Sequence, residues 1–310
     1  MEWLKKGLVY SPNAKNWWNK KYAMYPTPFL IEKKNIIRVF FGTVDDNFFG
    51  RTSYVDLNAD HPEIIMYNPN EYILDIGENG TFDDCGATPA SVIQKDGKLQ
   101  LYYSGFCRSF QTPYHIFSGI AISEDHLNFE KISKVPFMDR TSMEYFDRAG
   151  HAVIFDEGIY KCWYVSGVKW ETINSELFQN KKMPVHTIRF ASSIDSIHWV
   201  SLEEPCIPFL GEDEFGFGRP WVYKEGDIYR MWYSVRSRSK PYCMGYAESL
   251  DGINWSRKDA EVGIEKSDVG WDSSMICYGA VIRVKNKTYM FYNGNNHGET
   301  GFGFAELIKW

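Results

Sequence analysis

The stretch "SLDGINW", residues 249–255, has two relatives in the same chain. They are "SEDHLNF" at residues 123–129 and "SIDSIHW" at residues 193–199, so the three copies start at intervals of 70 and 56 residues. Serine and aspartate side chains can hydrogen-bond the backbone of a turn, and the aromatic residue can then anchor the strand that follows. The pattern Ser-x-Asp-x-x-x-aromatic therefore predicts a repeated turn of the scaffold.

A second pattern recurs in phase with this turn. Five short aromatic runs read as copies of one strand: "VFFGT" at 39–43, "LYYSG" at 101–105, "CWYVSG" at 162–167, "MWYSV" at 231–235 and "MFYNG" at 290–294. Aligned on Phe41, Tyr103, Tyr164, Tyr233 and Tyr292, they recur at spacings of 62, 61, 69 and 59 residues. A repeat of this length has room for four short strands and their loops, which is typical of a propeller blade.

The remaining strands of each repeat follow from the same alignment. An apolar, small-residue run precedes each aromatic strand, as in "TPFLIE" from Thr27 and "TPASVI" from Thr88, and predicts an innermost strand. A third run, such as "SGIAIS" or "MGYAES", leads into the repeated turn. The fifth repeat ends at "FAELIKW" without a fourth strand, while the N-terminal "EWLKKGLVYSP" resembles the fourth-strand segment "NWSRKDAEVGI".

These repeats predict an all-β, single-domain fold over residues 1–310: a five-bladed β-propeller closed by an N-terminal strand. Such closure removes the open sheet edge that would otherwise invite aggregation. Helix-period segments with caps are nearly absent, which argues against alternating strands and helices. A β-sandwich remains the rival architecture, but it would not explain five repeats in phase.

Composition excludes several classes of partner. The 310 residues are 44% hydrophobic and 24% charged, with a net charge of −6 and no run of lysine or arginine. Nucleic acids and anionic membranes need clustered cations, so neither is expected. No segment has the apolar core of a secretory signal or the length of a membrane span, which predicts a cytoplasmic protein without membrane insertion. The six cysteines are widely scattered and predict free thiols.

The turns of the form A-x-S-x-D-G-x-x-W and the "MWYS" and "LYYSG" strands carry a family resemblance along essentially the whole chain. The sequence resembles the five-bladed propellers of the furanosidase and β-fructosidase superfamily of glycoside hydrolases, which includes arabinanases, β-xylosidases, invertases and levansucrases. The resemblance implies carbohydrate chemistry, although these motifs belong to the scaffold. A structural calcium is common among such relatives, but no spacing of oxygen ligands here identifies one, and no cofactor is expected.

The resemblance also exposes departures at the positions that carry chemistry. Where relatives have an acidic residue before proline on the first inner strand, this chain has Thr27-Pro28. The segment expected to hold the acid of the third blade, a glutamate, reads "YFDRAGHAV", so Arg148 is a candidate for that position. In the second blade, "FDDCGATP" offers Asp83 and Asp84 a few residues early.

Polar residues near the starts of the inner strands are expected to face one mouth of the central channel. The candidate catalytic pair is Asp84 and Asp147, with Glu214 and Asp272 as alternates. The candidate substrate-binding residues come from the same strand starts and from loops after the second strands: Arg148, His151, Arg219, Tyr278, Arg108, Arg236, Asn293, Asn295 and His297. Each has a structural alternative: an aspartate can cap a turn, Arg219 can form an ion pair between blades, and His151 can be a core histidine.

Three functional hypotheses remain open from the sequence. The first is hydrolysis or transfer of a glycosyl unit by a carboxylate pair, separated by about 5–5.5 Å for retention or about 6.5–9.5 Å for inversion. The second is a non-hydrolytic sugar-binding protein of surface-polysaccharide synthesis. The third is an enzyme that modifies a nucleotide-linked or lipid-linked sugar, whose phosphate the arginines would meet.

Overall fold

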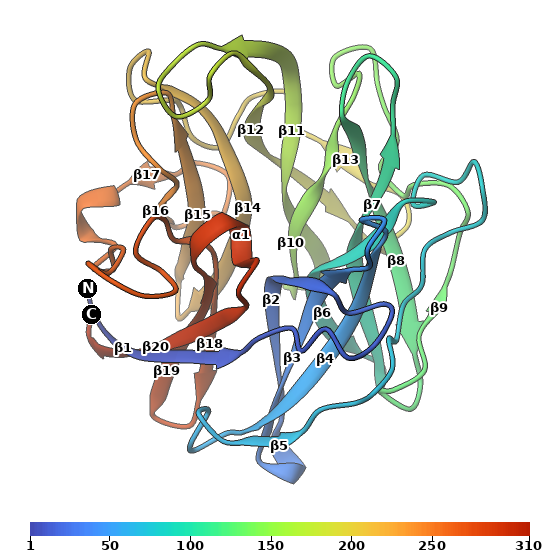
Figure 1. Ribbon diagram of the computed structural model, residues 1–310, viewed down its shortest axis with the longest axis vertical. Coiled ribbons are helices and arrows are strands. Elements are labelled where there is room, and N and C mark those ends of the chain that lie inside the picture. Colours follow the sequence, from blue (N-terminus) through green and yellow to red (C-terminus); the bar gives the residue numbers. More distant parts are fainter.

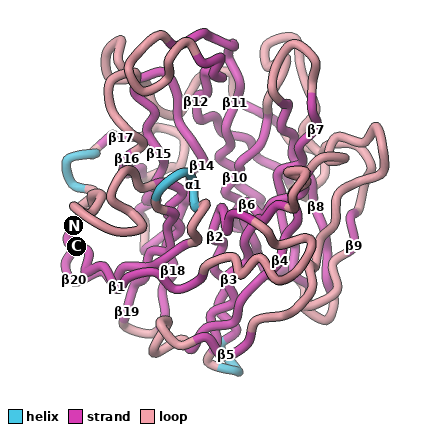
Figure 2. Tube along the Cα trace, in the orientation of Figure 1, coloured by secondary structure: helices cyan, strands magenta, loops and turns pink.

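The computed structural model describes all 310 residues, Met1 to Trp310, and its regular structure is almost entirely β-strand (Figures 1 and 2). The exceptions are the 3₁₀ turns η1 (Glu32–Lys34) and η2 (Asp259–Glu261) and the short helix α1 (Asn295–Gly298). None of these helices is long or apolar enough to cross a membrane. The predicted all-β class is confirmed.

The strands form three hydrogen-bonded sheets that together contain five antiparallel units of four strands. One sheet is a single unit, and the other two each join two units through one parallel residue pair, Gly50 with Gly86 and His186 with Gly216. Within a unit, each strand pairs with the next in antiparallel register. The units correspond to the repeats that the sequence predicts.

The strand bounds match the predicted runs. The first strands are β2 (Lys21–Ile31), β6 (Gly86–Lys95), β10 (Arg148–Asp156), β14 (Glu214–Glu225) and β18 (Cys277–Val284). The second strands are β3 (Ile36–Val44), β7 (Lys98–Arg108), β11 (Ile159–Ile173), β15 (Ile228–Ser237) and β19 (Lys287–Asn293). The third strands are β4 (Gly50–Asn58), β8 (Tyr114–Ser123), β12 (Lys181–Ser193), β16 (Cys243–Ser249) and β20 (Phe302–Lys309). The outer strands are β5 (Ile65–Tyr67), β9 (Glu130–Lys131), β13 (Val200–Ser201), β17 (Ser256–Arg257) and, in the last unit, β1 (Glu2–Tyr10).

The N-terminal strand completes the last unit, as predicted. β1 pairs antiparallel with β20 from Glu2 opposite Lys309 to Tyr10 opposite Phe302. The N- and C-termini lie side by side in Figure 1. The buried Trp3 side chain packs against the fourth unit, and its Nε1–H donates to the Val262 carbonyl at 3.0 Å. The first ten residues therefore contribute both a sheet edge and core contacts.

The Ser-x-Asp motif forms the turn between third and fourth strands, as predicted. Ser249 ends β16, and its hydroxyl donates to Asp251 and accepts the Gly252 N–H, both at 2.9 Å. Asp251 in turn accepts the backbone N–H groups of Ile253 and Asn254 at 2.8 Å. Equivalent turns follow Ser123 and Ser193. The motif is therefore a device of the scaffold.

The aligned tyrosines of the second strands also serve the scaffold. Tyr103 and Tyr233 lie opposite Gly119 and Gly245, where a Cβ atom would come within 2.2 Å of the ring. Each buried hydroxyl then reaches a carboxylate. The pairs are Tyr103 with Asp83 (2.9 Å), Tyr164 with Glu144 (2.9 Å), Tyr233 with Asp259 (2.6 Å) and Tyr292 with Asp272 (3.0 Å). This pairing satisfies groups that would be costly to bury alone.

Neighbouring units pack face to face through the core. Five clusters of buried apolar side chains each lie between two adjacent units, and the fifth of these interfaces joins the last unit to the first. The first strands pack beside one another in the order β2, β6, β10, β14, β18 and back to β2, around the centre of Figure 1. The starts of the first strands therefore meet at one place.

Candidate functional site

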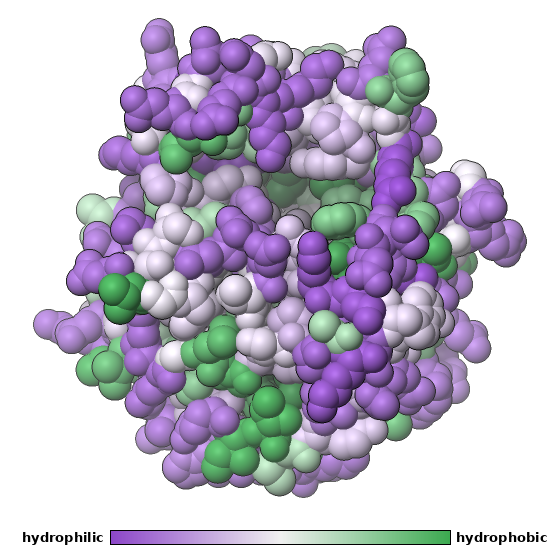
Figure 3. Space-filling view, in the orientation of Figure 1, coloured by the Kyte–Doolittle hydropathy of each residue, from purple (hydrophilic) through white to green (hydrophobic).

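A pocket of about 90 Å³ lies where the first strands meet. Figure 3 shows a hollow near the centre of this face, framed by hydrophilic side chains. We call it the axial pocket, and its lining includes Tyr25, Ser104, Phe106, Tyr114, Ile116, Asp147, His186, Arg219, Arg236, Tyr242 and Tyr278.

Asp147 is the only carboxylate in the lining of the axial pocket. It directly precedes β10, is 1% exposed, and has both oxygens engaged. Oδ1 accepts the Ile116 N–H at 2.9 Å, and Oδ2 lies 2.9 Å from His186 Nε2. On the far side of the imidazole, Arg236 Nη2 lies 2.6 Å from His186 Nδ1. The three side chains therefore form one hydrogen-bonded series across the pocket wall.

The chemistry of Arg236 determines the tautomer of His186. A guanidinium can only donate hydrogen bonds, so Nδ1 of His186 accepts and Nε2 carries the proton that is donated to Asp147. Burial, and after it the nearby positive charge of Arg236, lower the pKa of His186. The imidazole is therefore neutral and has no free lone pair. It positions Asp147 and Arg236 and cannot itself serve as a general base.

Arg219 also lines the axial pocket and holds several first strands together. It projects from β14, and its Nη1 donates to the carbonyls of Pro26 (3.0 Å) and Tyr278 (3.3 Å). Its Nη2 donates to Thr27 Oγ1 (2.7 Å) and to the Ala90 carbonyl (3.0 Å). No carboxylate pairs with it, and burial lowers the pKa of its guanidinium to about 9. The ion pair considered from the sequence is not formed.

Aromatic rings form much of the remaining wall. Tyr25 and Tyr278 lie with ring centroids 4.4 Å apart, and Tyr242 meets Tyr278 edge to face at 6.5 Å. Tyr114 and Phe106 add the rings of the second unit. Burial raises the pKa of Tyr25 to about 12, so its hydroxyl stays protonated and able to donate. Such walls suit a ligand with both apolar faces and hydroxyl groups.

Of the predicted site residues, the structure brings together Asp147, Arg219, Arg236 and Tyr278. It adds His186, Tyr25, Tyr114 and Tyr242, which sequence reasoning missed. A signal existed for part of this set: Ile116, His186 and Tyr242 each stand seven residues before the serine of a repeated turn. Equivalent positions of third strands therefore contribute to the same pocket.

The other three candidate carboxylates lie elsewhere, so the expected carboxylate pair is not assembled in the axial pocket. Asp84 lies in the loop before β6 and accepts the Gly80 N–H at 3.0 Å, as an aspartate that caps a turn does. Both oxygens of Glu214 are held by the Arg257 guanidinium at 2.8 and 2.9 Å. Asp272 pairs with Lys5 at 2.8 Å beside the Tyr292 hydroxyl. A hydrogen bond or ion pair outside the pocket therefore holds at least one oxygen of each of these three carboxylates.

Two basic candidates at the start of the third unit also face away from the axial pocket. Arg148 pairs with Glu144 at 3.3 Å and donates to Tyr164. His151 is fully buried between the rings of Tyr102 and Phe137, and burial lowers its pKa to about 3. It is a neutral core histidine, which was the structural alternative.

The loop candidates stabilise the rim and do not line the axial pocket. Arg108 donates to the Asn47 carbonyl and stacks over Phe49. Asn293 accepts the Tyr25 N–H at 2.9 Å, so it positions that ring. Asn295 accepts the Ser274 N–H at 2.7 Å.

His297 borders the aromatic wall. Its ring packs against Tyr242 at 4.7 Å, and its Nδ1 lies 3.4 Å from the Tyr278 hydroxyl. Burial lowers the pKa of His297 to about 4, so the ring is neutral at neutral pH. Neither here nor elsewhere in the structure is a group of three or more His, Cys, Asp or Glu side chains arranged to hold a metal ion.

Comparison with known proteins identifies relatives over the full length. No protein-family model matches the chain. The uncharacterized protein Rv1502 of Mycobacterium tuberculosis is 32% identical over 308 residues, which cover 99% of each chain. This protein belongs to the same family as Rv1502. The Rv1502 family is thus defined by likeness along the whole propeller and not by a shared segment.

Solved structures show which fold the Rv1502 family adopts. A glycosyl hydrolase from Bacteroides ovatus matches with a TM-score of 0.71 at 13% identity, covering 99% of this chain and 90% of that one. A thermostable family-43 glycoside hydrolase matches with 0.66 at 17%, covering 97% and 93%. The Bombyx mori GH32 β-fructofuranosidase BmSUC1 matches with 0.60 at 13%, covering 99% and 61%. The chain therefore has the β-propeller fold of glycoside hydrolases, which agrees with the resemblance seen in its sequence.

Proposed function

We propose that the protein binds a carbohydrate in the axial pocket. The pocket lies at the centre of a fold shared with glycoside hydrolases and combines five aromatic rings with two arginines, one carboxylate and a serine. Aromatic faces pack against the apolar faces of sugar rings, while the polar groups match hydroxyls. The combination of these groups in one recess is the observation that carries the proposal.

We further propose that this binding is not coupled to hydrolysis by a carboxylate pair. Both general mechanisms of glycoside hydrolysis need a second carboxylate opposite the first. Asp147 has no such partner in the pocket lining, and its two oxygens are held by Ile116 and His186. Thr27, where relatives are expected to carry an acid, is fully buried and accepts a hydrogen bond from Arg219.

The architecture of the proposal is a five-bladed propeller closed by the N-terminal strand. Five four-stranded units, five inter-unit clusters and the pairing of β1 with β20 support it. A cytoplasmic place in surface-polysaccharide synthesis, with nucleotide-linked or lipid-linked sugars as ligands, belongs to the same proposal. Fractionation of the native host and deletion of the gene with analysis of its surface glycans test that part.

Glycan binding and turnover should be measured on the same purified protein. Binding to a panel of mono- and oligosaccharides is expected for the wild type and is expected to weaken in Tyr114→Ala, which removes one ring of the wall. Tyr67→Ala is the matched control, because Tyr67 is half exposed on the outer strand β5, away from the pocket. No glycoside in a chromogenic panel should be hydrolysed.

Two outcomes would contradict the proposal. Hydrolysis that disappears in Asp147→Asn would show that this single carboxylate supports turnover and would restore the enzymatic hypothesis. Equal binding by the wild type and Tyr114→Ala would place the sugar outside the axial pocket.

A further inference from the structure

The buried arginines of this protein fall into two groups. Five arginines are buried, and three of them pair with carboxylates: Arg38 with Asp56 at 2.7 Å, Arg51 with Asp45 at 3.0 Å and Arg148 with Glu144 at 3.3 Å. The other two, Arg219 and Arg236, have no acidic side chain within 4.0 Å. Both line the axial pocket.

Neutral groups surround these two guanidinium ions. The four terminal N–H groups of Arg219 meet three carbonyls and one hydroxyl, and Arg236 donates to the carbonyls of Pro184 and Phe217 and to the neutral His186. Neutral acceptors satisfy hydrogen bonds but leave the positive charge uncompensated. A buried cation is costly without a counter-charge, and the other buried arginines have one.

Asp147 does not supply the missing charge. Its oxygens face the Ile116 N–H and His186, and the neutral imidazole separates it from Arg236. With His186 neutral, the lining carries two positive charges and one negative charge. The axial pocket is thus net cationic in a protein whose net charge is −6.

Further donors lie beside the two arginines. The tyrosines Tyr114 and Tyr242 belong to the same pocket lining as Arg219 and Arg236. Arg236 Nη1 donates to the Pro184 carbonyl and keeps a second N–H. Hydroxyl and guanidinium donors together suit an oxyanion, since charge-assisted hydrogen bonds to such groups are the strong ones.

We propose that the sugar bound in the axial pocket carries an anionic group, which Arg219 and Arg236 recognise by charge. The inference rests on the proposed function and adds the class of ligand: a uronic acid or a sugar phosphate. Both present an oxyanion on a polyhydroxylated ring, so the experiment must distinguish the carboxylate from the phosphate.

Isothermal titration calorimetry should compare the galactose, glucose and mannose series. Each series consists of the neutral sugar, its uronate and its 6-phosphate, and inorganic phosphate serves as the probe without a sugar. In at least one series we expect the uronate or the phosphate to bind about tenfold to a hundredfold more tightly than the neutral sugar. The preferred member identifies the anion. High salt should reduce the preference.

Arg236→Gln should reduce the preference to less than about threefold, because it removes a charge that has no partner in the free protein. Arg140→Gln is the control, since it removes one positive charge from an exposed position outside the pocket. Arg219 makes four scaffold contacts and is a poorer target for substitution. If Arg236→Gln does not fold, the comparison of ligands on the wild type still decides, because it needs no variant.

The outcomes separate this inference from the proposed function. Equal affinity for neutral and anionic sugars would overturn the inference and leave sugar binding intact. If inorganic phosphate binds and none of the sugars does, the anion site is supported and sugar binding is contradicted. An absence of any anion binding, by calorimetry and by thermal shift, would overturn the inference.

Discussion

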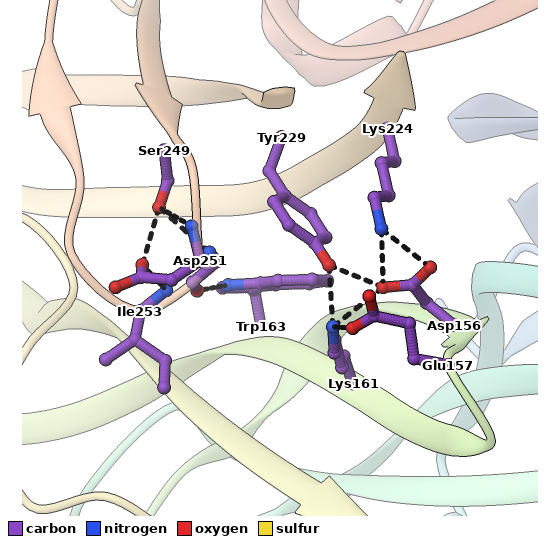
Figure 4. Close-up of polar contacts among 10 residues, drawn as sticks. Asp156, Glu157, Lys161, Trp163, Lys224, Tyr229, Ser249, Asp251 and Ile253 are labelled. Atoms are coloured by element: carbon purple, nitrogen blue, oxygen red, sulfur yellow. Dashed lines mark hydrogen bonds and ion pairs between the residues drawn. The ribbon is translucent and has the colours of Figure 1, made fainter. Parts of the chain in front are cut away.

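Charged side chains are buried both at the interface between the third and fourth units and in the axial pocket. Only those at the interface are paired with a side chain of opposite charge. At the interface, Lys161 pairs with Asp156 at 2.7 Å, and Lys224 reaches the same carboxylate at 2.8 and 2.9 Å (Figure 4). The Tyr229 hydroxyl completes the network. In the pocket, Arg219 and Arg236 meet only neutral groups. A buried charge with its counter-charge belongs to the scaffold, and one without it indicates a place for a ligand.

Among changes to the scaffold, removal of β1 should destabilise the protein most. Deletion of residues 1–10 removes the buried Trp3 and Tyr10, separates Lys5 from Asp272 and exposes the edge of β20. We expect loss of the folded state or aggregation, because an unpaired sheet edge and an open core cluster are both unfavourable. Circular dichroism melting and size-exclusion chromatography measure this. An unchanged melting temperature would contradict it.

Removing one scaffold carboxylate should cost stability without affecting ligand binding. Asp272→Ala leaves the buried Tyr292 hydroxyl without a partner and leaves Lys5 with the Ser267 hydroxyl as its remaining partner, and we expect the free energy of unfolding to fall by about 3–5 kcal/mol. Asp268→Ala, at an exposed position nearby, should stay within about 0.5 kcal/mol of the wild type. Urea denaturation and sugar binding are the measurements. Weakened binding in a folded Asp272→Ala protein would assign this residue to the site.

Acid should destabilise the protein through His151. The unfolded protein takes up a proton at this imidazole near pH 6.5, and the folded protein does so only near pH 3, so stability falls as the pH drops between these values. At pH 4 this group alone should reduce the free energy of unfolding by roughly 3 kcal/mol relative to pH 7. His151→Leu should flatten the profile between pH 7 and pH 4, because leucine does not titrate; Nε2 has no hydrogen-bond partner to lose, and Nδ1 has only a contact of 3.5 Å with Ser118 Oγ. A variant as acid-sensitive as the wild type would contradict this.

Asp147→Asn tests the hydrogen-bonded series in the axial pocket. Both oxygens of Asp147 accept hydrogen bonds, and His186 cannot reverse its tautomer without presenting Nδ1–H to a donor of Arg236. An amide would place one donor against another, so we expect a loss of about 1–3 kcal/mol in stability together with weaker sugar binding. Thermal denaturation and calorimetry compare it with Asp84→Asn, which should leave binding unchanged. Unchanged stability and binding in Asp147→Asn would remove the hydrogen-bonded series from the site.

Local pattern was enough to predict the strands and the turns. Short strands are held by pairing with their immediate neighbours, and turns by contacts within a few residues, so both leave a signature in the sequence. The aligned positions from Phe41 to Tyr292 and the three Ser-x-Asp turns are such signatures, and each falls where predicted. The completion of the last unit by β1 followed from the same periodicity.

The candidate site was predicted less completely. Asp147, Arg219, Arg236 and Tyr278 were found because they stand on or beside the predicted first and second strands, but Asp84, Glu214 and Asp272 stand at or before strand starts as well and bind partners outside the pocket. His186 was missed because it lies in the middle of β12, and its only signal in the sequence is its position seven residues before Ser193. Its partners Asp147 and Arg236 are 39 and 50 residues away.

Strand order, blade period and turn chemistry are thus properties that this sequence specifies through contacts near in the chain. The identity of the pocket is different, because it depends on which buried charges find a counter-charge once five units converge. Arg148 and Arg219 both stand on first strands, yet Arg148 meets Glu144 while Arg219 meets the carbonyls of Pro26, Ala90 and Tyr278 from three other units. The packing of the five units around the axis determines the distances between these arginines and their partners. A short stretch of sequence cannot predict those distances.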